Sequence, residues 1–170
     1  MPILAENLSV SFDHGKTFAL DGVNLRIEPG EFIAVIGLSG AGKSTFLRTI
    51  NAMVRPTGGK ISVLGNEVSE LRSKHLASHR RQIGFIFQQF NLVKSLTVVK
   101  NVLMGRIAYS PLWRSLSGLY ASEDIALARK TLDSVGLRGR HAEKVRNLSG
   151  GQQQRVAIAR ALVQQQRILL

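Results

Sequence analysis

The chain has 170 residues, no cysteine and a formal net charge of +12, from 23 Lys+Arg against 11 Asp+Glu. The length allows one domain, and the lack of cysteine excludes a disulfide framework, a cysteine-ligated zinc site and a thiol nucleophile. The positive charge indicates anionic partners, such as a nucleotide, a nucleic acid or a membrane surface. No apolar run approaches the roughly 18 residues of a membrane span, and the first residues do not resemble a signal peptide. These features predict a soluble intracellular protein.

Apolar patterning in the first half of the chain predicts strands grouped around a glycine-rich loop. Alternating apolar residues predict strands over 3–12 and 23–27. The continuous apolar run 31–36 predicts a strand that is buried on both faces. After the loop we expect, in order, a helix over about 43–52, a short strand over 60–64, a surface helix within 69–82 and a strand over 83–87.

The second half of the chain is predicted to be mainly helical. Three apolar residues fit one face of a first helix: Val98, Val102 and Ile107. Ser122, followed by two acidic residues, predicts the start of another helix, and Gly136 predicts its end. A last helix is expected over about 150–163, and residues 168–170 begin a strand. This order of elements predicts an α/β domain with a largely parallel core sheet.

Residues 37–45 fit the phosphate-loop pattern G-x-x-x-x-G-K-[ST]. Glycines let backbone N–H groups converge on phosphate oxygens, and the following helix start adds a partial positive charge. Lys43 is expected to reach the β- and γ-phosphates, Ser44 to ligate Mg²⁺ and Thr45 to add a phosphate contact. The ligand is therefore predicted to be a nucleoside triphosphate with Mg²⁺. The candidate binding residues are Gly37, Leu38, Ser39, Gly40, Ala41, Gly42, Lys43, Ser44 and Thr45.

Residues 148–155 read L-S-G-G-Q-Q-Q-R, which resembles the signature motif of the ATP-binding cassette (ABC) ATPases. A Ser-Gly-Gly sequence alone could be only a helix cap. Its place after a phosphate loop and before an apolar helix makes the resemblance specific. The resemblance implies a P-loop NTPase fold of the ABC type, and a homodimer in which the signature contacts the γ-phosphate of ATP held by the opposite subunit. The residues concerned are Leu148, Ser149, Gly150, Gly151 and Gln152.

Two further positions fit the same family pattern. Gln88, after an apolar strand, resembles the Q-loop glutamine, which implies that it ligates Mg²⁺ or the attacking water and couples the site to a membrane partner. Lys43 and Gln88 are thus the catalytic candidates, and Ser44 and Gln88 the Mg²⁺ ligands. Phe12 resembles the aromatic residue that stacks on adenine, although a core phenylalanine at a strand end is the alternative.

The segments 85–93, 101–106 and 109–116 most resemble the ATPase subunit of phosphonate importers. This resemblance implies an energy-coupling subunit that drives phosphonate uptake by ATP hydrolysis. It would lie on the cytoplasmic face of the inner membrane, bind membrane permease subunits and serve a periplasmic phosphonate-binding protein indirectly. It also implies an antiparallel N-terminal β part, a core over about 1–87 and 149–170, and a helical subdomain over about 88–148. In that subdomain we expect Tyr109 and Trp113 to be packing residues.

The chain departs from the family pattern at its end. Family members continue into a strand with a Mg²⁺-orienting Asp and a catalytic Glu, and then to a switch His, whereas this sequence stops at Leu170. We therefore expect ATP contacts to survive, hydrolysis to be lost and the incomplete sheet to fold poorly. All four histidines precede the signature and are expected at the surface: His14, His75, His79 and His141.

Three alternative functions remain open from the sequence. The first is an ABC ATPase for another solute, such as an amino acid or a lipoprotein-release cargo. The second is a non-transport ABC protein that acts on nucleic acid or ribosomes. Because the chain has no arginine-rich arm or basic patch interleaved with aromatic residues, no nucleic-acid partner is expected. The third is an inactive remnant that binds nucleotide.

Overall fold

The computed structural model describes residues 2–109 and 120–170, apart from the side chains of residues 73 and 74. The chain divides into two compact units, one up to Arg80 and the other from Arg81 to Leu170, and each is described by itself. No helix in the described ranges combines the length and the apolar character needed to cross a membrane.

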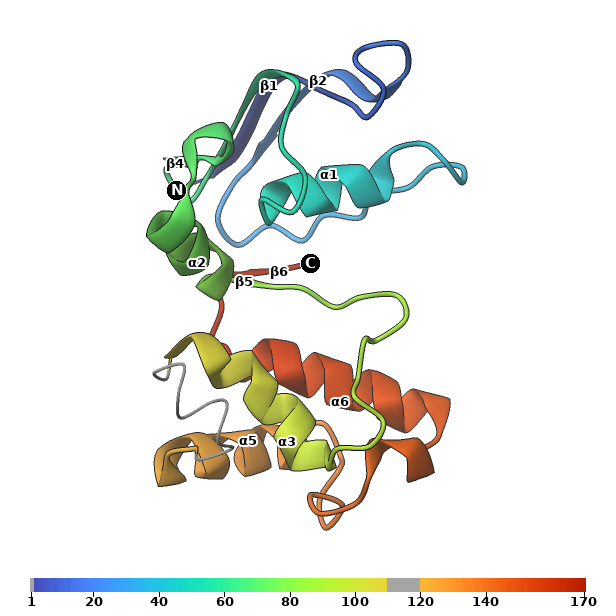
Figure 1. Cartoon of the computed structure of the whole chain (residues 1–170), viewed down its shortest axis with the longest axis vertical. Coiled ribbons are helices and arrows are strands. Elements are labelled where there is room, and N and C mark those ends of the chain that lie inside the picture. Colours follow the sequence, from blue (N-terminus) through green and yellow to red (C-terminus); the bar gives the residue numbers. More distant parts are fainter. Residues whose placement is uncertain (1, 110–119) are drawn as a thin grey trace. The chain divides into compact units, whose positions relative to one another are not determined.

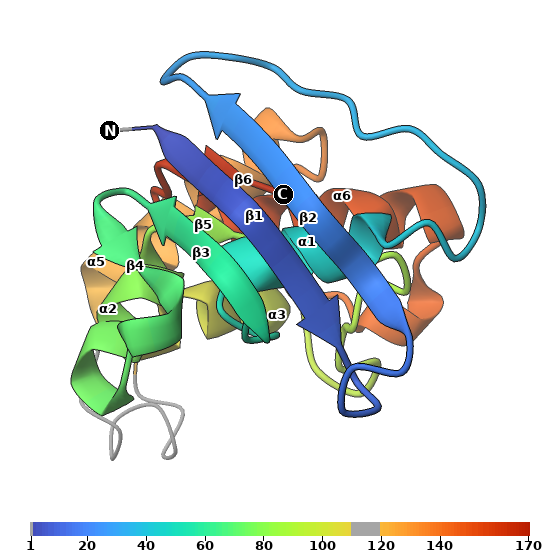
Figure 2. The ribbon, with the colours of Figure 1, turned by 90° about the horizontal axis from the view of Figure 1, so that it is seen from above.

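The first unit is built on a four-stranded antiparallel sheet with the strand order β2-β1-β3-β4 (Figure 2). The inward side chains of β1 alternate as predicted, except that a bulge shifts the alternation between Ala5 and Leu8. At this bulge Asn7 has a left-handed backbone (φ 48°), and its N–H donates to Asn24 Oδ1 at 2.9 Å. The strands are β1 (Ile3–Ser11), β2 (Phe18–Ile27), β3 (Gly58–Val63) and β4 (Asn66–Glu67).

Two helices and a 3₁₀ turn complete this unit: α1 (Lys43–Ile50), η1 (Val68–Glu70) and α2 (Ser73–Arg81). Helix α1 lies against the sheet through Phe46 and Ile50, which are both buried (Figure 2). Helix α2 is joined to the end of α1 by His79, whose Nε2 lies 2.9 Å from Ile50 O. His79 is only 1% exposed, so the expectation of a surface histidine was wrong here. The ring is enclosed because it contacts the main chain at the end of a neighbouring helix.

The apolar run 31–36 is not a strand in this structure, which corrects the expectation from its sequence. Phe32 is 95% exposed and Ile36 90% exposed, and the whole run lies in the irregular connection between β2 and α1 (Figure 1). A strand buried on both faces needs neighbouring strands to satisfy its backbone N–H and C=O groups. No strand in the described part of the chain pairs with this run.

The second unit combines a helical cluster with a two-stranded parallel ladder. The ladder pairs Ile83 with Ile168 and Gly84 with Leu169. The strand expected over 83–87 is therefore regular only at 83–84, although the Ile86 N–H still donates to Leu170 O at 2.8 Å. The helices pack through a buried apolar core that includes Val102, Leu132 and Val156. The elements are β5 (Ile83–Gly84), α3 (Val98–Leu103), η2 (Met104–Tyr109), α5 (Ser122–Ser134), η3 (Val145–Asn147), α6 (Gly150–Leu162) and β6 (Ile168–Leu169).

The start of α5 differs from the predicted cap. Its N-cap residue is Ala121, which has no side chain that could cap the helix, and Ser122 is already the first helical residue. Asp124 in the first turn is largely buried and paired with Arg106 at 2.8 Å, so a tertiary ion pair anchors this turn. Gly136 follows the helix with φ 75°, as predicted.

The region around η2 holds two residues on which the sequence made predictions. Ile107 lies in η2 and is 36% exposed, so it does not continue the buried face of α3. Tyr109 donates its hydroxyl to Gln164 O at 2.7 Å, and the Arg106 guanidinium lies 3.9 Å from its ring centroid. Trp113 lies outside the described residues.

Candidate functional site

The phosphate loop, residues 37–45, leads directly into α1. Gly42 is the N-cap of the helix and has φ 80°, and Gly40 has φ 83°. Such left-handed backbones are costly for residues with a Cβ, so the motif needs glycine at both positions. The Ala41 N–H donates to Leu38 O at 3.2 Å, which closes a turn just before the helix. The N-terminal end of α1, with its free N–H groups, therefore lies at the loop, as an anion site requires.

Lys43 lies across this loop. Its ammonium donates to Gly37 O at 2.8 Å and to Leu38 O at 2.6 Å, so the lysine that is expected to reach a phosphate also holds the loop closed. Ser44 is exposed and Thr45 half-buried in the first turn of α1. Their hydroxyls are therefore carried by the same helix start as the Lys43 ammonium.

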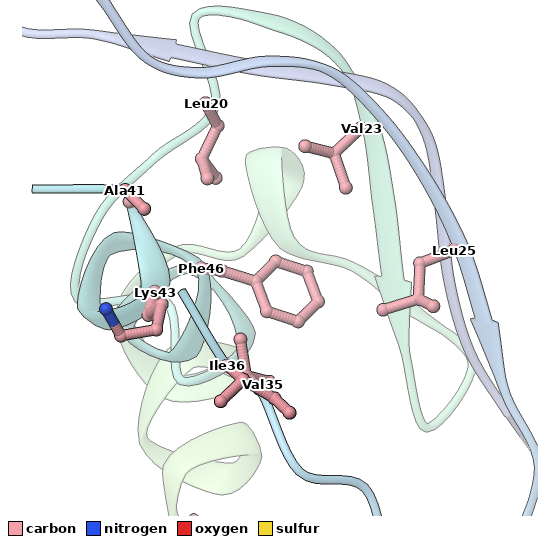
Figure 3. Close-up of a pocket in the computed structure, with 9 residues that line it drawn as sticks. Leu20, Val23, Leu25, Val35, Ile36, Ala41, Lys43 and Phe46 are labelled. Carbon is pink, nitrogen blue, oxygen red and sulfur yellow. The ribbon is translucent and has the colours of Figure 1, made fainter. Parts of the chain in front are cut away.

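An apolar cavity of about 210 Å³ lies beside the loop (Figure 3). The Phe46 ring projects from α1 toward Val23 and Leu25 of β2 (Figure 3). Val35 and Ile36 close another side. The rest of the lining comes from the phosphate loop itself, Ala41 to Lys43, so this mostly apolar cavity borders the candidate anion site.

A second hollow surrounds Phe12, at the turn between β1 and β2. Phe12 is 71% exposed, which excludes the alternative that it is a core residue. The exposed ring is available for stacking. The hollow is lined by Ser11, Phe12, His14, Gly15, Phe18 and Thr57.

Asp13 fixes the turn that carries Phe12. Its carboxylate accepts hydrogen bonds from Ser11 Oγ (2.8 Å), Thr17 N (2.8 Å) and Thr17 Oγ1 (2.5 Å). These bonds, above all the one from the Thr17 hydroxyl, lower the pKa of Asp13 from 3.8 to about 2. Asp13 is therefore ionised at neutral pH, and the turn is held by an anion that accepts three hydrogen bonds.

The start of β2 brings the phosphate loop and the Phe12 hollow together. Phe18 lines the hollow, and a Cβ placed on Gly42 would collide with the main-chain oxygen of Ala19. Strand β2 begins before the strand expected over 23–27 and includes Gly22, which has φ 57°. Two of the predicted binding features thus meet within the first unit.

The signature residues form the start of α6 in the second unit. Ser149 and Gln152 make a capping box, in which Ser149 Oγ accepts from Gln152 N at 3.4 Å and Gln152 Oε1 accepts from Ser149 N at 2.9 Å. Leu148 is buried beneath this turn. Gly150 and Gly151 are exposed, and a Cβ on either would meet no atom within 4 Å. The helix start is therefore open to an incoming anion.

Gln88 lies in a turn of the same unit, after β5. The turn is closed by Phe90 N donating to Phe87 O at 2.9 Å, and Gln88 is exposed on it. Behind it lies Arg160 of α6, which donates to two carbonyls of this segment. Sequence reasoning missed Arg160; its only signal was an arginine on the apolar helix that follows the signature. Gln88 and the signature helix are thus joined within one unit.

Comparison with known proteins identifies the family. The model of the ABC transporter family matches residues 20–170. A phosphonates import ATP-binding protein PhnC of Bradyrhizobium diazoefficiens is 51% identical over 168 residues, which are 99% of this chain and 62% of the relative. A protein of the same name from Lactobacillus delbrueckii subsp. bulgaricus is 46% identical over 165 residues, 97% of this chain and 64% of the relative. The chain thus spans less than two thirds of these relatives.

Solved structures agree with this assignment. One is a dimeric ATP-binding cassette in a post-hydrolysis state, bound to ADP and Pi, with a TM-score of 0.81 and 38% identity. The alignment covers 98% of this chain and 72% of the cassette chain. Another is the cbiO1 protein of Clostridium perfringens, part of the ABC transporter complex cbiONQ, with a TM-score of 0.81 and 29% identity. That alignment covers 98% of this chain and 63% of the cbiO1 chain. From its motifs, its fold and these matches, the chain belongs to the ABC transporter family.

Proposed function

We propose that this protein is the ATP-binding, energy-coupling subunit of a phosphonate importer. The observation that carries the proposal is that two helices begin next to glycines in a chain that resembles PhnC proteins. Helix α1 begins after Gly42 of the phosphate loop, and α6 begins after Ser149, with Gly150 and Gly151 in its first turn. Each helix start suits a phosphate group. In the complete protein, ATP hydrolysis would drive uptake through permease subunits at the cytoplasmic face of the membrane. A periplasmic phosphonate-binding protein would deliver the solute.

The residues of the first unit would hold the nucleotide. Phe12 would stack on the base, the loop N–H groups and Lys43 would bind phosphates, and Ser44 would offer its hydroxyl to Mg²⁺. In the described part of the chain no three His, Asp or Glu side chains gather to hold a metal ion. One hydroxyl fits an ion that is bound mainly through substrate phosphates and water. Bound Mg²⁺ would neutralise the charge that develops on the phosphates.

The second unit carries the other residues to which we assign a role. Gln88 would orient the attacking water or Mg²⁺, and Leu148 to Gln152 would act on ATP held by a second copy of the chain. This role would require a homodimer, as the resemblance to the family implies. We also propose the division into a core, about 1–87 with 149–170, and a helical subdomain over about 88–148.

Nucleotide binding and turnover in the full-length protein test the enzymatic part. We expect Mg²⁺-dependent ATP hydrolysis that Lys43→Ala lowers at least 100-fold, because the charge that stabilises the transferring phosphoryl group is lost. Lys130→Ala, an exposed lysine on α5, is the matched control and should leave turnover unchanged. Equal turnover in the two variants would contradict the assigned role of Lys43.

Uptake by membrane vesicles that contain the permease and binding protein tests the solute. Phosphonate uptake that needs this subunit and ATP supports the proposal. Uptake of an amino acid in place of phosphonate would assign the subunit to another importer.

A further inference from the structure

The turn that carries Gln88 continues into two residues with left-handed backbones. Phe90 has φ 59° and Asn91 has φ 46°. Asparagine tolerates this conformation, but it is unusual for a bulky phenylalanine, so surrounding contacts must hold it in place. The Asn91 N–H also donates to Gln89 O at 2.6 Å, which tightens the bend directly after Gln88.

Arg160 supplies those contacts. Its Nη1 donates to Asn91 O at 2.7 Å and its Nη2 donates to Phe90 O at 2.6 Å. The planar guanidinium fork thus engages two successive carbonyls through two N–H groups that its plane holds at a fixed separation. Burial lowers the pKa of Arg160 below its ordinary value, although a guanidinium stays protonated at neutral pH.

The backbone of Arg160 is itself held firmly. It lies in the last turn of α6, the helix that Ser149 caps. A Cβ on Gly105 would collide with Arg160 O and would lie 2.8 Å from Val163 Cγ1, so η2 packs directly on this turn. The guanidinium therefore extends from a rigid element.

The far side of the Gln88 turn is anchored separately. The buried Asn101 accepts from Val93 N at 2.8 Å and donates from Nδ2 to Val93 O at 3.0 Å. Between this anchor and β5, Arg160 makes two side-chain hydrogen bonds to the left-handed bend. Loss of Arg160 would release the bend and leave both ends of the segment in place.

We propose that Arg160 is a positioning residue that sets the turn of Gln88 and ties it to the helix headed by the signature residues. The catalytic consequence of this inference rests on the proposed function, but the link that Arg160 makes between the turn and α6 does not depend on it. Movement of the α6 start would then be transmitted along a rigid helix to the glutamine. Gln88 and the signature residues at the start of α6 would then move together.

Hydrogen exchange of the full-length protein tests the tie without any assay of activity. In Arg160→Gln we expect the amides of residues 87–91 to exchange at least 10-fold faster than in the unmodified protein, and the amides of Val102 and Leu132 to keep their protection. Arg129→Gln is the matched control, because Arg129 is an exposed arginine on α5. Exchange over 87–91 within twofold of the unmodified protein would overturn the proposal.

Arg160→Lys keeps the test decisive if the glutamine variant does not fold. One ammonium replaces the fork, so exchange over 87–91 should rise at least threefold; an unchanged rate would equally overturn the tie.

Kinetics separate positioning from general damage. For Arg160→Lys we expect kcat to fall about 10-fold with ATP affinity unchanged within twofold, because the phosphate loop is untouched. A fall in affinity with unchanged kcat would contradict a positioning role. If the unmodified protein hydrolyses no ATP, the proposed function fails, and hydrogen exchange still decides the tie.

Discussion

Gly42→Ala offers a direct measurement of how closely the phosphate loop approaches β2. Alanine at φ 80° carries a conformational cost of roughly 1–2 kcal/mol. Its Cβ would also collide with Ala19 O and would lie 3.0 Å from Leu20 Cδ2. Overpacking of this kind costs about 1–3 kcal/mol. We therefore expect Gly42→Ala to lower the free energy of unfolding by about 2–5 kcal/mol, a large part of the 5–15 kcal/mol typical of a domain.

Gly40→Ala isolates the collision from the conformational cost. Gly40 has nearly the same φ of 83°, but a Cβ there meets nothing within 4 Å. The gain from a less flexible unfolded chain is the same for both variants and cancels in the difference. Urea unfolding of the full-length protein, followed by far-UV circular dichroism, should place Gly42→Ala about 1–3 kcal/mol below Gly40→Ala at equal m values. Two variants of equal stability would show that the loop does not lie against Ala19.

Two further predictions concern His79 and Ser149. Burial, and to a lesser extent the charge of Arg80, lower the pKa of His79 below 6.5 in the folded chain. Because the unfolded state then binds the proton more readily, the free energy of unfolding decreases as the pH falls below about 6.5. His79→Leu should flatten the dependence of the unfolding midpoint on pH between about pH 7.5 and 5.5, and an unaltered slope would contradict this origin. Ser149→Ala should cost about 1 kcal/mol by removing half of the capping box. Ser149→Asp should restore this stability but not ATP hydrolysis, because a carboxylate repels phosphate; recovery of hydrolysis would exclude an anion at this helix start.

Features specified by neighbouring residues were predictable from the sequence. The turn of the phosphate loop depends on left-handed glycines at 40 and 42 and on the helix after them, and all three lie within residues 40–50. The cap of α6 is likewise local, since Ser149 and Gln152 satisfy each other. Gly136 ends α5 for the same kind of reason, a left-handed residue after the last turn.

Features that depend on distant partners were not predictable. The run 31–36 has the composition of a buried strand, but a strand needs a paired neighbour, and composition does not supply one. His79 is buried because the end of α1 faces it, 29 residues away in the chain. Ser122 had the pattern of a cap, but the cap position falls on Ala121, and Asp124 in the first turn pairs with Arg106, 18 residues away in the chain. Arg160 gave no local signal, because its partners are 69 and 70 residues away.

The two hydrogen bonds of Lys43 limit how it can serve a nucleotide. An ammonium has three N–H donors, and two of them are committed to Gly37 O and Leu38 O. One donor is left for a phosphate oxygen, so the lysine can bind the ligand without giving up its hold on the loop. In the proposed nucleotide complex one ammonium would thus hold the loop and bind a phosphate at once, and both loop contacts would remain in place after the phosphate leaves.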